Sequence, residues 1–148
     1  MTPHILLTTD LSEESLRAFE PVGAIASALG ARITLLHVAV HAAIAAPVGE
    51  VVPPADVPVG IEEMTARARE RLVQLRSRLP ADVPVEPTVI EAGAAAQAIT
   101  DWARENGVDY VAMATHGRSG LARMLLGSVA ENVLRHSAKP MLLFPRTD

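Results

Sequence analysis

The residues most suited to chemistry are concentrated in one stretch, ATHGRSGLARMLLGSVAEN. Its glycines, Gly117, Gly120 and Gly127, let the backbone present successive N–H groups around a phosphate, because they lack a Cβ and tolerate positive φ. Ser128 adds a hydroxyl where a helix is expected to begin, and Arg118 or Arg123 adds positive charge. The stretch therefore predicts a phosphate-binding loop, with a plain surface loop that carries helix-capping residues as the alternative.

The carboxyl ends of two expected strands also look suited to a ligand. The first strand ends in Thr8, Thr9 and Asp10, and the fourth ends in Met113, Ala114, Thr115, His116 and Gly117. In an open parallel sheet, ligands bind in the crevice beyond such strand ends. Asp10 is suited to accept a hydrogen bond from a ribose hydroxyl or a base amino group. His116 is suited to order the neighbouring loop or, as the alternative, to donate a proton.

The elements that must position these residues alternate along the chain. Short, mostly continuous apolar runs predict strands at residues 4–9, 32–38, 88–92, 110–115 and 141–145. Apolar stripes with a helical period predict helices at residues 12–29, 60–79, 94–106 and 127–136. Continuous apolar strands that alternate with helices indicate an open parallel α/β sheet with helices on both faces.

Prolines refine this pattern. Pro21 lies inside the first expected helix and predicts a kink there, because proline removes a hydrogen bond of the helix interior. The third strand, expected near residues 83–91, contains Pro84 and Pro87, which predict that it lies at an edge of the sheet. The proline-rich apolar residues 39–60 predict a long loop, for which a ligand lid, a partner contact and packing on the domain itself stay open.

Composition excludes several classes of function. The net charge of −4 and an aromatic content of 3% argue against a nucleic-acid partner. The absence of cysteine excludes disulfides and thiolate chemistry. The N-terminus does not resemble a signal peptide, and no apolar run approaches the roughly 18 residues of a membrane span. We therefore expect a cytoplasmic protein with no membrane partner, and one domain over residues 1–148.

Other nucleotide and metal motifs are missing from the sequence. There is no G-x-x-x-x-G-K-[ST] and no G-x-G-x-x-G after the first strand, which argues against a P-loop NTPase and a dinucleotide-binding dehydrogenase. His37 and His41 are four residues apart, but His37 ends a strand, so we expect no metal site. A phospho-accepting receiver domain would need a lysine at the end of the fifth strand, whereas Lys139 precedes that strand.

Nearly the whole chain resembles the universal stress protein family. The likeness is carried by ILLTTDLSEES, ITLLHV and YVAMATHGRSGLARMLLGSVAENVLRHSAKPMLLF. The last segment is similar to the family's ATP-binding pattern G-x2-G-x9-G-[ST], with Gly117, Gly127 and Ser128 in place and Ala114 where the first glycine is expected. The resemblance implies a Rossmann-like, adenine nucleotide α-hydrolase-like fold with strand order 3-2-1-4-5, ATP between strands one and four, and homodimers paired through residues 141–144.

The resemblance also implies roles for individual residues. Thr8, Thr9, Asp10 and Val38 would surround the adenine and ribose, Met113 and Ala114 would lie by the sugar, and Gly117, Gly127, Ser128, Val129 and Ala130 would hold the phosphates. The implied function is an ATP-binding regulatory module of the stress response, with or without Mg²⁺ and with unidentified protein partners. We expect little or no ATP hydrolysis, because no positioned base or phosphate-gripping lysine is evident. A dimeric interaction protein that binds no nucleotide is the alternative, since Ala114 departs from the pattern.

Overall fold

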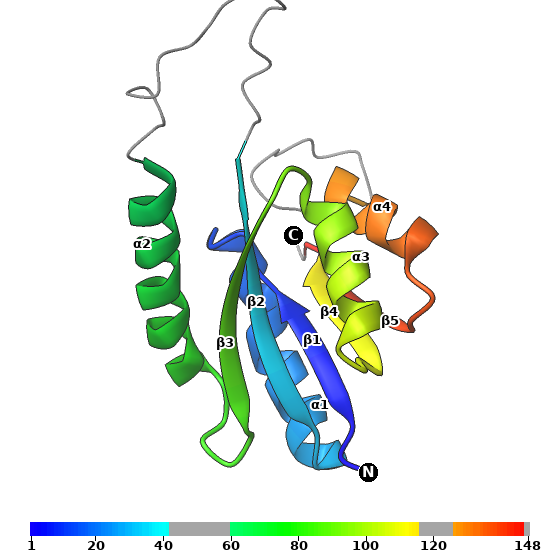
Figure 1. The fold of residues 1–148 in the computed structure, drawn as a ribbon. Helices are drawn as coiled ribbons and strands as arrows, with labels where there is room; N and C mark the ends of the chain where they lie inside the picture. Colours follow the sequence, from blue (N-terminus) through cyan, green and yellow to red (C-terminus); the bar gives the residue numbers. More distant parts are fainter. Residues whose placement is uncertain (42–59, 116–125, 147–148) are drawn as a thin grey trace, which may run out of the picture.

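The computed structural model describes residues 1–41, 60–115 and 126–146, which form one five-stranded sheet with helices on both sides (Figure 1). The strands are β1 (His4–Thr8), β2 (Arg32–Val40), β3 (Val85–Ala92), β4 (Tyr110–Ala114) and β5 (Met141–Phe144). Every pairing is parallel and the order is β3-β2-β1-β4-β5. The predicted fold class and strand order are confirmed.

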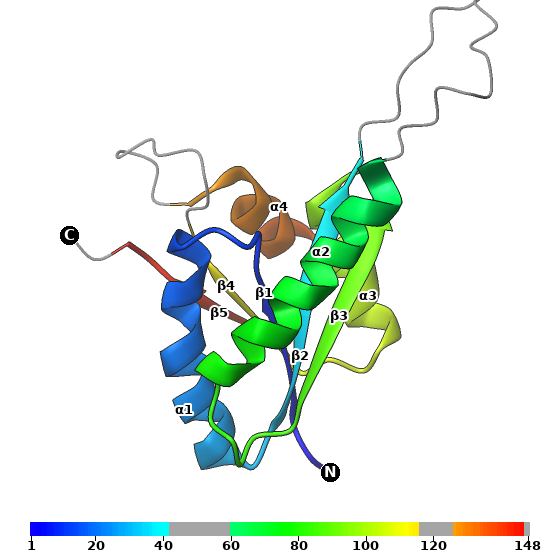
Figure 2. The ribbon, with the colours of Figure 1, turned by 90° about the vertical axis from the view of Figure 1, so that its left-hand side faces the viewer.

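The helices lie between successive strands, as parallel pairing requires. They are α1 (Phe19–Leu29), preceded by the 3₁₀ helix η1 (Glu14–Ala18); α2 (Gly60–Leu75), continued by the 3₁₀ helix η3 (Arg76–Arg78); α3 (Ala95–Glu105); and α4 (Ser128–His136). Figures 1 and 2 show α1 and α2 on one face of the sheet and α3 and α4 on the other. Within the described residues, no helix is long and apolar enough to cross a membrane.

Apolar side chains fill both spaces between sheet and helices, which explains why the strands read as continuous apolar runs. In β1 all five residues are buried. Ile5 and Leu7 pack with the layer of α1 and α2, whereas Leu6 packs with the layer of α3 and α4. Because side chains alternate along a strand, β1 contributes to two cores at once.

His4 begins β1 and is buried, with 2% of its surface exposed. Its Nε2 lies 2.8 Å from the hydroxyl of Thr34, and its ring packs edge-to-face with that of Trp102 at a centroid distance of 6.1 Å. Burial lowers the pKa of His4 below its ordinary value, and the nearby charge of Arg32 lowers the pKa further. The Asn106 backbone and two carboxylates, those of Asp109 and Glu86, act in the opposite direction.

The structure corrects the prediction about Pro21. The segment is not one kinked helix over residues 12–29: η1 ends at Ala18, and the α-helix begins anew at Phe19. Pro21 thus falls in the first turn of α1, where backbone N–H groups have no partner within the helix, so proline removes no hydrogen bond. Its fixed φ suits this position and produces no interior kink.

The two outer strands differ in how they are covered. β3 pairs with β2 alone, which confirms its predicted place at an edge, and Pro87 lies within it. Helix α2 packs against β3, where the buried hydroxyl of Thr65 donates to Glu91 at 3.1 Å. β5 pairs with β4 alone, and each of its four residues is half-buried. In the described part of the chain, β5 is therefore a sheet edge with apolar side chains.

Candidate functional site

A cavity of about 360 Å³ lies at the carboxyl ends of the central strands β1, β2 and β4. After β1 the chain continues into a helix on one face of the sheet, whereas it enters β4 from α3 on the other face. The neighbouring strands β1 and β4 are therefore the place where the strand order reverses its direction. Such a switch point separates the loops and opens a crevice. The fold therefore places a cavity where the polar ends of two strands meet.

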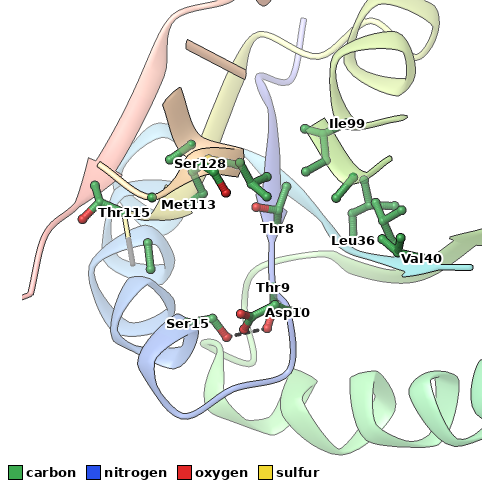
Figure 3. A pocket seen from close by; sticks show the side chains of 16 residues that line it. Thr8, Thr9, Asp10, Ser15, Leu36, Val40, Ile99, Met113, Thr115 and Ser128 are labelled. Carbon is green, nitrogen blue, oxygen red and sulfur yellow. Dashed lines mark hydrogen bonds between the residues drawn. The ribbon is translucent and has the colours of Figure 1, made fainter. Parts of the chain in front are cut away.

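One wall of the cavity is aliphatic. It includes Leu36, Val38 and Val40, which alternate along β2, and Ala95 and Ile99, which are four residues apart on α3. Figure 3 shows Leu36, Val40 and Ile99 together on one side of the cavity, with Thr8 of β1 between them and the opposite side. A wall of this kind suits a flat apolar group such as a nucleobase.

The opposite side is the beginning of α4. Gly127 precedes the helix in extended conformation, with φ −68° and ψ 159°, and its N–H donates to the carbonyl of Thr115. Its own carbonyl accepts from Glu131 at 2.9 Å, which closes the first turn. The N–H groups of Ser128, Val129 and Ala130 thus belong to the first turn, which has no acceptors for them within the helix. These three residues line the cavity, so the positive end of the helix dipole faces it.

The base of the cavity is the loop that follows β1. Asp10 is exposed, and its Oδ1 accepts hydrogen bonds from the N–H of Ser12, at 2.9 Å, and from the Ser12 hydroxyl. Leu11 has a φ of 67°, the one positive φ outside glycine in the described residues. Such a φ is strained for a side chain of this size. The turn therefore holds Asp10 in a fixed place at the cavity, with its second carboxylate oxygen left for a ligand.

Asp10 is the only charged side chain among the described residues that line the cavity. An anion held there would depend on backbone N–H groups and on the helix dipole rather than on a cationic side chain of the described part. Within the described residues, no three His, Asp or Glu side chains are arranged to hold a metal ion. His37 donates instead to the carbonyl of Thr9, at 2.9 Å, so its Nδ1 has a partner other than a metal.

Ten of the residues predicted from the sequence lie in the wall of this one cavity: Thr8, Thr9, Asp10, Val38, Met113, Ala114, Gly127, Ser128, Val129 and Ala130. The four others fall outside the described residues: His116, Gly117, Arg118 and Gly120. The expected loop over residues 39–60 also lies largely outside them, although β2 continues to Val40. The structure therefore brings the strand ends and the start of α4 together.

The predicted site residues left out six lining residues, although Thr115 was expected at the end of the fourth strand: Ser15, Leu36, Val40, Ala95, Ile99 and Thr115. Leu36 and Val40 share the face of Val38, so the period of two residues in a strand was a usable signal. Thr115 directly follows the predicted Ala114. The side chains of Ala95 and Ile99 carry no polar atom, and nothing in the sequence distinguishes an apolar residue that lines a cavity from one that packs in the core.

Comparison with known proteins finds a family model and individual relatives that match this chain. The family model described as Usp, universal stress protein family, matches residues 1–145. The universal stress protein MJ0577 of Methanocaldococcus jannaschii is 34% identical over 85 residues, which is 57% of this chain and 52% of that protein. This alignment thus spans about half the length of the curated relative.

Solved structures match over almost the whole chain. The structure of hypothetical protein MJ0577 has a TM-score of 0.77 and 27% identity, and covers 100% of this chain and 99% of its own. A universal stress protein in complex with cAMP has a TM-score of 0.66 and 24% identity, with 99% and 98% covered. The universal stress protein of Archaeoglobus fulgidus in complex with dAMP has a TM-score of 0.59 and 19% identity, with 97% of each chain covered. The last two likenesses show a shared fold.

Proposed function

The chain belongs to the universal stress protein family, and from this membership and the geometry of its cavity we propose that it is a regulatory module that binds ATP or a related adenine nucleotide. The module is one cytoplasmic domain over residues 1–148. Its bound and free states are read by protein partners. Proteins of the same fold bind cAMP and dAMP, which supports an adenine nucleotide as the ligand.

The observation that carries this proposal is the meeting of three different surfaces in one cavity. The aliphatic wall of Val38, Val40 and Ile99 receives the adenine ring, whose faces are apolar. The free oxygen of Asp10 accepts from a ribose hydroxyl or from the amino group of the base. The N–H groups at the start of α4 bind a phosphate, to which the helix dipole adds about 0.3–1 kcal/mol. An adenine nucleotide supplies all three groups in one molecule.

Turnover of the nucleotide is slow or absent in this proposal. Rapid phosphoryl transfer needs a group that positions the attacking water and cations that neutralise the developing charge. The described residues of the cavity wall contain Asp10 and hydroxyl groups but no lysine, arginine or histidine. Binding itself is therefore the signal, and the module acts as a switch rather than as an enzyme.

Two copies of the chain pair through β5 in this proposal. The carbonyls of Pro140 and Phe144 accept hydrogen bonds from Val111 and Thr115, so these alternate positions face β4. Because the pattern along a strand has a period of two, the backbone groups of Met141 and Leu143 face away from β4. An apolar edge with free backbone groups favours pairing with a second strand.

Calorimetry with ATP, ADP and AMP, each with and without Mg²⁺, tests the proposal. We expect one binding site per chain and retained binding without the metal, because N–H groups rather than a cation hold the phosphate. A cavity variant, Ile99→Trp, fills the place of the base and serves as the blocked control. Heat from this variant equal to that of the wild type, or no heat from either, would rule the site out.

A dimeric interaction protein without a nucleotide is the second candidate function. Ala114 favours it, because the family pattern expects glycine at this position and a Cβ there reduces the space beside the sugar. Chromatography of the denatured protein as purified separates the two candidates. Copurified adenine nucleotide supports the first, whereas a dimer that neither carries nor binds nucleotide supports the second.

A further inference from the structure

His37 does not line the nucleotide cavity, but it is bonded to a residue that does. It lies in β2 between Leu36 and Val38, whose side chains point to the face of α3 and α4. By alternation, the His37 side chain points to the opposite face, where it lines a second cavity of about 670 Å³ beside α2. From there its Nδ1 lies 2.9 Å from the carbonyl oxygen of Thr9.

The direction of this hydrogen bond fixes the proton on His37. A carbonyl oxygen only accepts, so Nδ1 carries the hydrogen and donates it. In a neutral imidazole the other nitrogen, Nε2, then has no hydrogen and is an acceptor. The contact therefore selects one of the two tautomers of His37.

The carbonyl of Thr9 belongs to the peptide unit that continues into Asp10. Thr9 follows the last residue of β1, and its N–H is held by the carbonyl of Leu36 at 3.0 Å. Its carbonyl is held by the His37 side chain rather than by a neighbouring strand. The two hydrogen bonds fix the peptide units before and after Thr9. The orientation of the unit between Thr9 and Asp10 sets the direction in which the Asp10 side chain leaves the backbone.

The hydroxyl groups of the loop complete this arrangement. The N–H of Leu11 donates to the hydroxyl oxygen of Thr9 at 3.0 Å. Ser15 donates its hydroxyl proton to the carbonyl of Ser12 at 2.7 Å, so in its 2.7 Å contact with Thr9 it accepts, and Thr9 donates. These bonds hold Leu11 in its strained positive φ. They act within the loop, whereas His37 and Leu36 attach the loop to the sheet.

We propose that His37 is a positioning residue of the nucleotide site: by donating its Nδ1 hydrogen to Thr9, it sets the peptide that carries Asp10 and so aims the carboxylate at the ligand. This inference rests on the proposed function, because it assigns His37 a part in nucleotide binding that it performs without touching the nucleotide.

The tautomer of His37 is measured first, and without any nucleotide. Long-range proton–nitrogen correlation spectra of ¹⁵N-labelled protein at pH 8 distinguish the two neutral forms, and His37→Asn identifies the signals by their loss. We expect His37 in the Nδ1–H form, which is the less populated form of free histidine in water. An Nε2–H form would overturn the hydrogen bond and with it the proposal.

Two amide variants then test the hydrogen bond independently of the loss of the imidazole ring, because both variants lose the ring. Asn places its amide near the position of Nδ1, whereas Gln reaches the position of Nε2. Calorimetric titration with ATP should give His37→Asn an affinity within about twofold of the wild type and His37→Gln an affinity about tenfold weaker, which is the range for one lost hydrogen bond. Equal affinities for the two variants would refute the role of Nδ1.

A double-mutant comparison shows whether His37 acts through Asp10. In the Asp10→Ala background, His37→Asn and His37→Gln should bind ATP equally, because no carboxylate is left to aim. A tenfold difference that persists in this background would contradict positioning through Asp10. If the wild type binds no adenine nucleotide at all, the proposed function fails and this inference falls with it. If the wild type binds and the amide variants match, only the role of His37 is lost.

Discussion

The change Ser128→Pro tests whether the backbone at the start of α4 holds the phosphate. Ser128 is the first residue of the helix, a position where proline is favoured because its missing N–H has no partner within the helix. The residue before proline must be extended, and Gly127 already has φ −68° and ψ 159°. The variant therefore removes one N–H group from the cavity while leaving the helix intact.

The expected loss follows from the type of hydrogen bond. An N–H that donates to a charged acceptor contributes about 1.5–3 kcal/mol, and about 1.4 kcal/mol is tenfold in Kd. We therefore expect Ser128→Pro to bind ATP and AMP about 10- to 150-fold more weakly than Ser128→Ala, which loses the hydroxyl but keeps the N–H. The free energy of unfolding should stay within about 0.5 kcal/mol of the wild type in both variants.

Isothermal calorimetry of the two variants with AMP and with adenosine makes the comparison. Adenosine carries no phosphate, so the two variants should bind it equally if the lost N–H served the phosphate. Equal AMP affinity for Ser128→Pro and Ser128→Ala would refute the reasoning, because it would show that this N–H group does not contact the ligand.

Three further outcomes follow from other parts of the fold. Leu143→Pro removes an outward N–H from β5 and should turn a dimer into a monomer in light scattering, whereas Leu143→Val should not. The pKa of His4 is lowered by burial, so stability is full above its ordinary pKa of 6.5 and declines as pH falls below it; urea unfolding of the non-titrating His4→Gln should lack this component. Gly23→Ala brings a Cβ within 2.5 Å of Cδ of Pro80 and should cost about 1–3 kcal/mol in the same assay, despite the better helix propensity of alanine.

Much of the fold could be predicted because the sheet is buried on both faces. Strands such as β1 have no solvent face, so their apolar runs are unbroken and easily told from helices. The start of α4 was equally readable, since Gly127 and Ser128 are residues that begin helices and bind anions. The prediction failed at Pro21, which is compatible either with one kinked helix or with a new helix that begins just before it. The boundary between Ala18 and Phe19 depends on tertiary packing, so the local sequence does not reveal it.

From residue types alone, only the polar part of the candidate site could be predicted; apolar lining residues such as Val38, Val129 and Ala130 were predicted from the family resemblance. Asp10 lies at a strand end, where the ligands of an open parallel sheet bind, and Ser128 follows a glycine at the start of a helix, where anions bind. Ile99 and Ala95 are as apolar as any core residue, and their place beside the cavity follows from how α3 lies across the sheet. That placement is a property of the assembled layers, which no local pattern of residues encodes.

The hydroxyl groups beside Asp10 make the two ends of the cavity differ in the hydrogen-bonding groups that they offer. The hydroxyls of Thr9 and Ser15 both donate their hydrogens within the loop, so their oxygens can offer a ligand only lone pairs. At the start of α4 the backbone offers N–H groups instead. A phosphate is repelled by the first and drawn to the second, while hydroxyl and amino groups behave in the opposite way. In the proposed complex this polarity therefore favours one orientation of the nucleotide, with its phosphate at the start of α4 and its hydroxyl or amino groups beside Asp10.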